Sequence, residues 1–289
     1  MCRVGSATRR GDARNPLSNV APSLSFRAAG ALLGLAAGRA LALGEAPDGS
    51  LALTWILAEE LAAGRRDLRA LAHRWIERHR ADPRGVDPET AAALTHLGQH
   101  DAPPARAAGV GSDPLVRCVP VALAAFDAPR TLVSATYHIA ALTHPDPVVA
   151  WSAVAVNVAL ARLLQGNRDF VPDVVEALRS NEVPPELLAA VRRVPLPAAA
   201  APALGAAGIA LADAEAALRM AYHEPLLARG VPAAGAPGPG AAARAGLVGA
   251  LLGARVGAAA IPAVWTSHVD GDILRSLAAR LVRTEAAAV

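Results

Sequence analysis

Residues 244–261 read RAGLVGALLGARVGAAAI, and glycine recurs in this stretch at every third or fourth position. The glycines are Gly246, Gly249, Gly253 and Gly257. Residues spaced in this way share one face of an α-helix. Because each glycine inside a helix costs about 1 kcal/mol relative to alanine, a run of them needs a reason. We predict that residues 244–261 form a core helix whose glycine face lets a neighbouring helix approach closely.

A second stretch with the same spacing lies near the N-terminus. Residues 27–41 contain Gly30, Gly34 and Gly38, each four residues from the next. Apolar residues form another face of the same expected helix. We therefore predict that the two glycine-lined helices pack against each other.

The composition favours helices throughout. Of the 289 residues, 53% are hydrophobic and only 3% are aromatic, so alanine, leucine and valine must build the core. Small side chains of this kind suit closely packed helices, and no alternating strand pattern is present. We predict an all-α fold in one compact domain of roughly ten helices. The further helices are expected at residues 51–63, 68–79, 88–97, 115–126, 132–142, 147–164, 171–179, 185–194, 212–222 and 273–282.

Composition also indicates where the domain begins and where its loops lie. Residues 1–24 mix Arg, Ser, Asn, Gly and Pro without periodicity, so we expect a disordered leader followed by a helical domain over residues 25–289. Residues 101–114 and 230–240 are rich in Pro, Gly and Ala and are expected to be loops.

Charge and cysteine content exclude several classes of partner. The net charge is only +3, which gives no reason to expect nucleic acid or a membrane surface as a partner. The longest apolar runs, residues 147–160 and 198–212, are too polar or too rich in alanine to span a bilayer. Cys2 and Cys118 have neither disulfide nor metal spacing. A cytoplasmic protein is expected.

Five segments, in the same order along the chain, carry a family resemblance. They are RAAGALLGLAAGRALALG (27–44), LALTWILAEEL (51–61), GSDPLVRCVPVAL (111–123), AALTHPDPVVAWSAVAVNVALARLLQG (140–166) and GLVGALLGARVGAAAIPAVW (246–265). Over about residues 26–283 the chain resembles the ADP-ribosylglycohydrolase family. The resemblance implies an all-helical fold with a central cleft. There, family members hold two magnesium ions and cleave the glycosidic bond between ADP-ribose and a protein side chain.

The first two metal motifs of the family are altered here. In the opening helix Arg39 stands where the family has an aspartate. Aligning residues 48–51 with the family's Thr-Asp-Asp-Thr motif replaces the two aspartates by Gly49 and Ser50. Asp48 remains nearby as a single carboxylate, shifted from the usual position.

The last metal motif, Gly-Asp-Ala-Asp-Thr in the family, is altered as well. Gly240 and Ala242 replace its aspartates, and Ala243 replaces its threonine. Magnesium is a hard cation that needs several oxygen ligands, which these side chains do not supply. We therefore expect no metal and no cofactor, and loss of the family's metal-dependent hydrolysis.

A polar segment that the resemblance places at the cleft is retained. His144 and Asp146, within Thr-His-Pro-Asp, are candidate acid–base groups, since imidazole exchanges protons near neutral pH. Asp48 is a third catalytic candidate. In the alternative interpretation, His144 and Asp146 only cap the helix that follows.

Further candidates are contacts to a ligand in the cleft. They are Ser50, Ser112, Asp113, Arg117, Tyr222 and His223. The Arg117 guanidinium could clamp an anionic group through two hydrogen bonds, or it could belong to a structural salt bridge. Tyr222 and His223 would approach the cleft as in the family, or would end a solvated helix.

Three functions stay open at this point. The chain is a pseudoenzyme that keeps the cleft for a small nucleotide- or ribose-like ligand, or as a scaffold. Alternatively it is a metal-independent enzyme acting on a small molecule, with His144 and Asp146 as acid–base groups. The third possibility is a true ADP-ribosyl hydrolase with substitute metal ligands. The resemblance does not choose among the three, because a fold does not fix a function.

Overall fold

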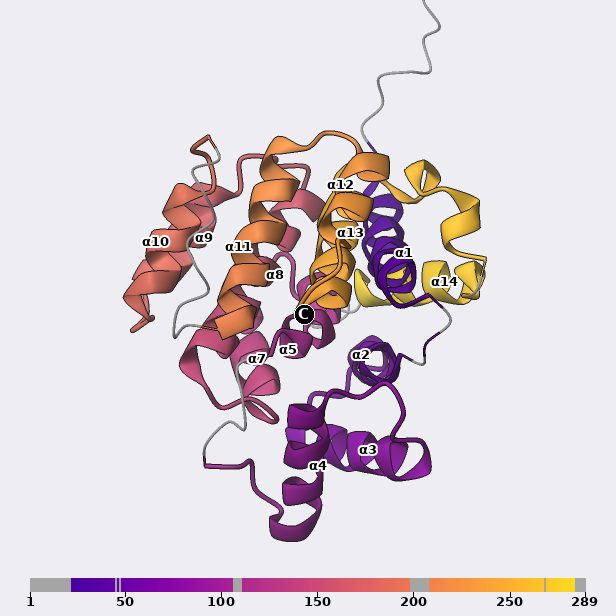
Figure 1. The fold of residues 1–289 in the computed structure, drawn as a ribbon, viewed down its shortest axis with the longest axis vertical. Coiled ribbons are helices and arrows are strands. Elements are labelled where there is room, and N and C mark those ends of the chain that lie inside the picture. Colours follow the sequence, from indigo (N-terminus) through magenta and orange to yellow (C-terminus); the bar gives the residue numbers. More distant parts are fainter. Residues whose placement is uncertain are drawn as a thin grey trace, which may run out of the picture.

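The computed structural model describes residues 22–44, 46, 48–105, 111–197, 208–267 and 269–283. Every regular element in these ranges is a helix, which confirms the predicted all-α fold (Figure 1). The elements are α1 (Leu24–Leu43), α2 (Gly49–Ala62), α3 (Leu68–Ala81), α4 (Pro88–His100), α5 (Asp113–Arg117), α6 (Val119–Ala124), α7 (Pro129–Ala141), α8 (Pro147–Leu164), α9 (Val171–Arg179), α10 (Pro185–Arg193), α11 (Gly208–His223), α12 (Leu227–Ala234), α13 (Ala241–Val256), the short 3-10 turns η1 (Ala258–Ala260) and η2 (Ala263–Trp265), and α14 (Gly271–Leu281).

Helices α1 and α13 pack directly on each other through their glycines, as predicted, and lie side by side in Figure 1. A Cβ atom added to Gly34 would lie 2.0 Å from the Gly249 carbonyl oxygen, and one added to Gly253 would lie 2.0 Å from that of Gly30. No side chain fits at these positions. The absence of side chains therefore lets the two backbones touch.

The predicted end of the second glycine helix was wrong. Helix α13 ends at Val256, before Gly257, which has a φ of 84° and donates its N–H to the Gly253 carbonyl oxygen over 2.8 Å. Gly257 therefore terminates the helix in the left-handed region that glycine tolerates. Gly246 also differs from the prediction, because it faces the side chains of Arg39 and Leu35 instead of a backbone.

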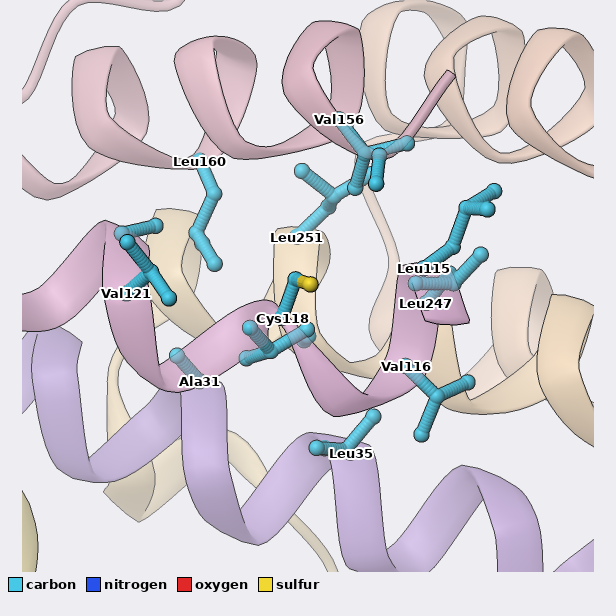
Figure 2. Packing of buried hydrophobic residues seen from close by; sticks show 14 of the residues in the cluster. Ala31, Leu35, Leu115, Val116, Cys118, Val121, Val156, Leu160, Leu247 and Leu251 are labelled. Carbon is cyan, nitrogen blue, oxygen red and sulfur yellow. The ribbon is translucent and has the colours of Figure 1, made fainter. Parts of the chain in front are cut away.

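Helix α8 is the central element of the core. Nearly all of its residues are buried, and it packs against α7, α11, α13 and the short helices α5 and α6. Figure 2 shows side chains from α1, α5, α6, α8 and α13 meeting in one cluster, among them Leu35, Leu115, Val121, Val156 and Leu251. Helices α1 and α8 are long and apolar enough to cross a membrane, but 67% and 83% of their apolar windows are buried inside the fold. Such burial is typical of core helices.

Two loop and helix boundaries also differ from the sequence expectations. The expected loop 230–240 contains the end of α12, and the helix expected over residues 115–126 is two helices, α5 and α6, meeting at Cys118. The Cys118 carbonyl accepts from Asn157 Nδ2 over 2.7 Å, and Pro120 has no N–H to continue a helix across the junction. Residues 1–21 of the expected leader lie outside the described residues; α1 begins directly after its cap, Ser23.

Candidate functional site

A hollow of about 380 Å³ opens where the C-terminal end of α1 meets the N-terminal ends of α4, α5, α11 and α13. We call it the cleft. Its lining residues are Ala42, Leu43, Asp87, Glu89, Gly111, Ser112, Asp113, Ile209, Gly238, Gly240, Ala241, Ala242 and Ala243. We call the lining contributed by Asp87, Glu89 and Asp113 the acidic wall, and the glycine and alanine lining of residues 238–243 the opposite wall.

Arg39 places a buried positive charge beside the acidic wall. Its side chain is only 4% exposed and donates from Nε and Nη2 to the two Asp48 oxygens over 2.6 and 2.7 Å. Nη1 reaches Asp113 Oδ1 at 3.4 Å. Burial opposes the charged form, but Asp113 and Asp48 outweigh it and raise the pKa of Arg39 above its ordinary value. A permanent guanidinium cation is therefore held between carboxylates.

Asp113 and Asp87 lie close enough to shift each other's pKa values, and the two shifts run in opposite directions. Burial, reinforced by the charge of Asp87, raises the pKa of Asp113 despite the nearby Arg39. Burial would also raise the pKa of Asp87, but the charge of Arg117 and hydrogen bonds from Asp113 and Thr90 hold it below its ordinary value. Asp87 also caps α4 by accepting from the Thr90 N–H over 2.8 Å.

Glu89 faces the cleft with His144 behind it. His144 is fully buried; its Nε2 lies 3.4 Å from Glu89 Oε2, and its Nδ1 lies 3.1 Å from Thr143 Oγ1. Burial, and then the charge of Arg117, lower the pKa of His144 to about 3, so the ring is neutral near pH 7. Burial and the charge of Asp87 raise the pKa of Glu89. Glu89 lines the cleft and His144 does not, so Glu89 is the member of this pair that a ligand can reach.

Arg117 lies inside the protein beneath this acidic wall. It is 1% exposed, donates to Thr90 Oγ1 over 2.9 Å and to Thr143 Oγ1 over 2.5 Å, and stands 3.9 Å from Asp87. Its guanidinium also lies 5.6 Å from the ring centre of Trp75. Among the described residues Arg117 therefore links α4, α5 and the segment before α8, and it does not line the cleft.

Asp213 of α11 fixes the opposite wall. It accepts from Ser112 Oγ over 2.7 Å and from Arg244 Nη1 over 2.8 Å. A Cβ atom on Gly240 would lie 1.9 Å from Asp213 Oδ2, and Gly240 has a φ of 72°. Asp213 thus occupies the space that a side chain at position 240 would need.

The structure gathers only some of the predicted site residues. Ser112 and Asp113 line the cleft, and Asp48 stands next to it through Arg39. Ser50 is fully buried, its hydroxyl has no hydrogen-bond partner among the described residues, and it does not line the cleft. Asp146 caps α8 by accepting from the Val148 N–H over 2.8 Å.

Tyr222 and His223 are the last two residues of α11 and do not line the cleft. Tyr222 makes an edge-to-face contact with Phe170, and His223 Nε2 lies 2.7 Å from the Val194 carbonyl oxygen. These contacts tie the end of α11 to α9 and to the segment after α10.

Sequence reasoning missed Asp87, Glu89 and Asp213. Asp87-Pro88-Glu89 is a recognisable helix start, with a capping aspartate, a first-turn proline and an acidic residue. That signal fixes a helix boundary, and nothing in it says that the boundary faces a cleft. Asp213 is buried in mid-helix and has no local signal beyond its being a charge on an apolar face.

One group of side chains could hold a metal ion. Asp87, Glu89 and His144 each offer a ligand atom, and these atoms lie within 4.8 Å of one another. Carboxylate and imidazole ligands suit a divalent transition metal. The positive charge of Arg117, 3.9 Å from Asp87, opposes a cation there.

The fold and this cleft can now be compared with known proteins. The ADP-ribosylglycohydrolase family model matches residues 21–288, so this chain belongs to that family. No curated protein matches the sequence. A solved structure named "ADP-ribosylglycohydrolase-related protein complex" has a TM-score of 0.75 and 24% sequence identity, over 90% of this chain and 98% of that chain. At this identity the likeness establishes the fold.

Proposed function

We propose that this protein binds a small nucleotide- or ribose-like molecule in the cleft, as a pseudoenzyme that has lost the two-magnesium hydrolysis of its family. The observation that carries the proposal is the position of Arg39. Its guanidinium holds two of the carboxylates beside the cleft, Asp48 and Asp113, and Asp48 is the one that remains next to an altered metal motif. In this proposal the Arg39 guanidinium supplies the positive charge that magnesium ions supply in the family.

The residues at the remaining metal positions do not fit the family's pair of ions. A Cβ atom on Gly49 would lie 2.5 Å from the Arg84 carbonyl oxygen, and position 240 is closed by Asp213. An aspartate at position 49 or 240 therefore could not be restored without moving neighbouring backbone or side chains. Magnesium requires near-octahedral oxygen ligands, so we derive no step through it.

The two walls of the cleft suit the two ends of a ribose phosphate. Hydroxyl groups can donate to Asp87 and Glu89 on the acidic wall. On the opposite wall α13 begins at Ala241 without a side-chain cap, and a helix N-terminus favours a phosphate. A volume of about 380 Å³ is within the range of small-molecule sites.

Calorimetric titration with ADP-ribose and ribose 5-phosphate, in the presence of EDTA, tests the binding. Glu89→Gln removes an acceptor of the ligand's hydroxyls and should weaken binding about tenfold. Glu182→Gln, an exposed residue after α9, serves as the matched control and should leave binding unchanged. Release of ADP-ribose from a modified peptide that magnesium stimulates and EDTA stops would overturn the proposal.

A metal-independent enzyme is the second candidate, and one observation favours it. Glu89 combines a raised pKa with a place on the cleft wall, which suits a general acid or base. In this version the acid–base group is Glu89, positioned by His144, instead of His144 and Asp146. Turnover of a ribosyl compound in EDTA that Glu89→Gln abolishes would select this candidate over the pseudoenzyme.

The proposal also includes a cytoplasmic location and the absence of nucleic-acid and membrane partners. The cysteine pattern favours the cytoplasm, and Cys118 is a buried free thiol. The small net charge supports the absence of nucleic-acid and membrane partners.

A further inference from the structure

A second hollow, separate from the cleft, lies between α2, the start of α3, α6 and α7. Its volume is about 470 Å³, and it shares no lining residue with the cleft. Its inner surface is made of buried aliphatic side chains: Leu57, Leu61, Leu71, Val121 and Ile139. We call it the apolar hollow.

Basic side chains surround the entrance of the apolar hollow. The lining includes Arg65, Arg66 and Arg130 against two acidic residues, Glu60 and Asp67. Both acidic groups are already engaged. Glu60 accepts from Arg65 over 2.7 and 2.8 Å and also pairs with Arg74. Asp67 caps α3 by accepting from the backbone N–H groups of residues 69 and 70.

Arg130 is the basic group that the protein itself leaves uncompensated. It is exposed at the start of α7, and it has no ion pair or hydrogen bond with any of the described residues. The entrance therefore offers a guanidinium beside an aliphatic interior, an arrangement complementary to a molecule with an apolar body and one anionic group.

We propose that the apolar hollow binds a small amphipathic carboxylate, with its hydrocarbon part against the leucines and its carboxylate at Arg130. At about 30 Å³ for each water-sized group, the hollow accommodates roughly 15 non-hydrogen atoms. Decanoate is a suitable probe of that size. This site is independent of the function proposed for the cleft.

Calorimetric titration with decanoate, decanol and decyltrimethylammonium tests the proposal. The carboxylate should bind at one site per chain and more tightly than the alcohol, with the cation weakest. Arg130→Gln should weaken decanoate about tenfold and leave decanol within about twofold, because only the charged hydrogen bonds are lost. Thermal melts check that the variant is folded.

A second variant locates the binding. Arg130 also borders a wider hollow on the other side of α7, next to Tyr137 and Trp151. Ala135 lines only the apolar hollow and is not fully buried, so Ala135→Leu should fill the site and block decanoate without unfolding the protein. Glu89→Gln in the cleft is the control and should bind decanoate as the wild type does. Unsaturable binding, equal affinity for decanoate and decanol, or full binding by Ala135→Leu would each overturn the proposal.

Discussion

The Arg39 guanidinium donates two hydrogen bonds, of 2.6 and 2.7 Å, to the Asp48 carboxylate. Asp48 also accepts from the Leu51 N–H over 2.9 Å and so caps α2. One carboxylate thus orients a helix and neutralises a buried cation at once. This pair joins α1 to α2 beside the cleft.

Replacing Arg39 should therefore show how much its positive charge contributes to the stability of the fold. Arg39→Met keeps the length of the side chain but leaves Asp48 and Asp113 without a counter-charge, which should lower the unfolding free energy by about 3 kcal/mol. Magnesium should partly restore the Tm of this variant while leaving the wild type unchanged. Arg65→Met removes an exposed partner of Glu60 and, as the control, should change stability by less than about 1 kcal/mol.

Millimolar magnesium or manganese should not raise the Tm of the wild-type protein. A specific metal site stabilises the native state by binding it preferentially, and the proposed function has no such site. Differential scanning fluorimetry with and without EDTA makes the measurement. A rise in Tm that Glu89→Gln removes would assign a metal to Asp87, Glu89 and His144, and one that Asp48→Asn removes would contradict the role given to Arg39.

The buried His144 should make the protein sensitive to acid. Its pKa is lowered from 6.5 to about 3 by burial and by Arg117. Between these values the unfolded chain binds a proton that the native state does not, so the contribution of His144 to stability falls as the pH falls from about 6.5 towards 3. The raised pKa values of Glu89 and Asp113 act in the opposite direction, since their contributions are lost as the pH rises.

Urea unfolding across this pH range, compared between the wild type and His144→Asn, isolates the histidine. The variant should show a shallower loss of stability between pH 6.5 and 3. Because the readout is the slope against pH, an overall destabilisation of the variant does not affect the conclusion. Equal slopes would mean that His144 titrates alike in the folded and unfolded states.

The glycine contact between α1 and α13 should not tolerate a side chain. A Cβ atom at position 249 would lie 2.0 Å from the Gly34 carbonyl oxygen. Gly249→Leu should therefore lower the unfolding free energy by about 3 kcal/mol or prevent folding. Gly98→Ala in α4, where the nearest atom is the mobile end of Arg80 at 3.0 Å, is the control and should be close to neutral. A stable Gly249→Leu protein would show that the helices can separate.

The sequence by itself determined the features that depend on local spacing. The glycine repeats predicted that α1 and α13 pack together, because residues three or four apart necessarily share a helix face. Asp67 and Asp270 cap α3 and α14, and such a cap involves only the next few residues of the chain. The five segments that resemble the family were sufficient to predict the fold.

Only the tertiary structure decided the composition of the cleft. Glu89 meets His144 across 55 residues, and Ser112 meets Asp213 across 101. Arg39 reaches Asp113 across 74 residues. The sequence around one residue of such a pair does not identify the other residue. Which side chains meet depends on which helices converge in the folded protein. The convergence is set by the close contact of α1 and α13 and by the packing around α8, and it places helix starts far apart in the sequence around one cavity.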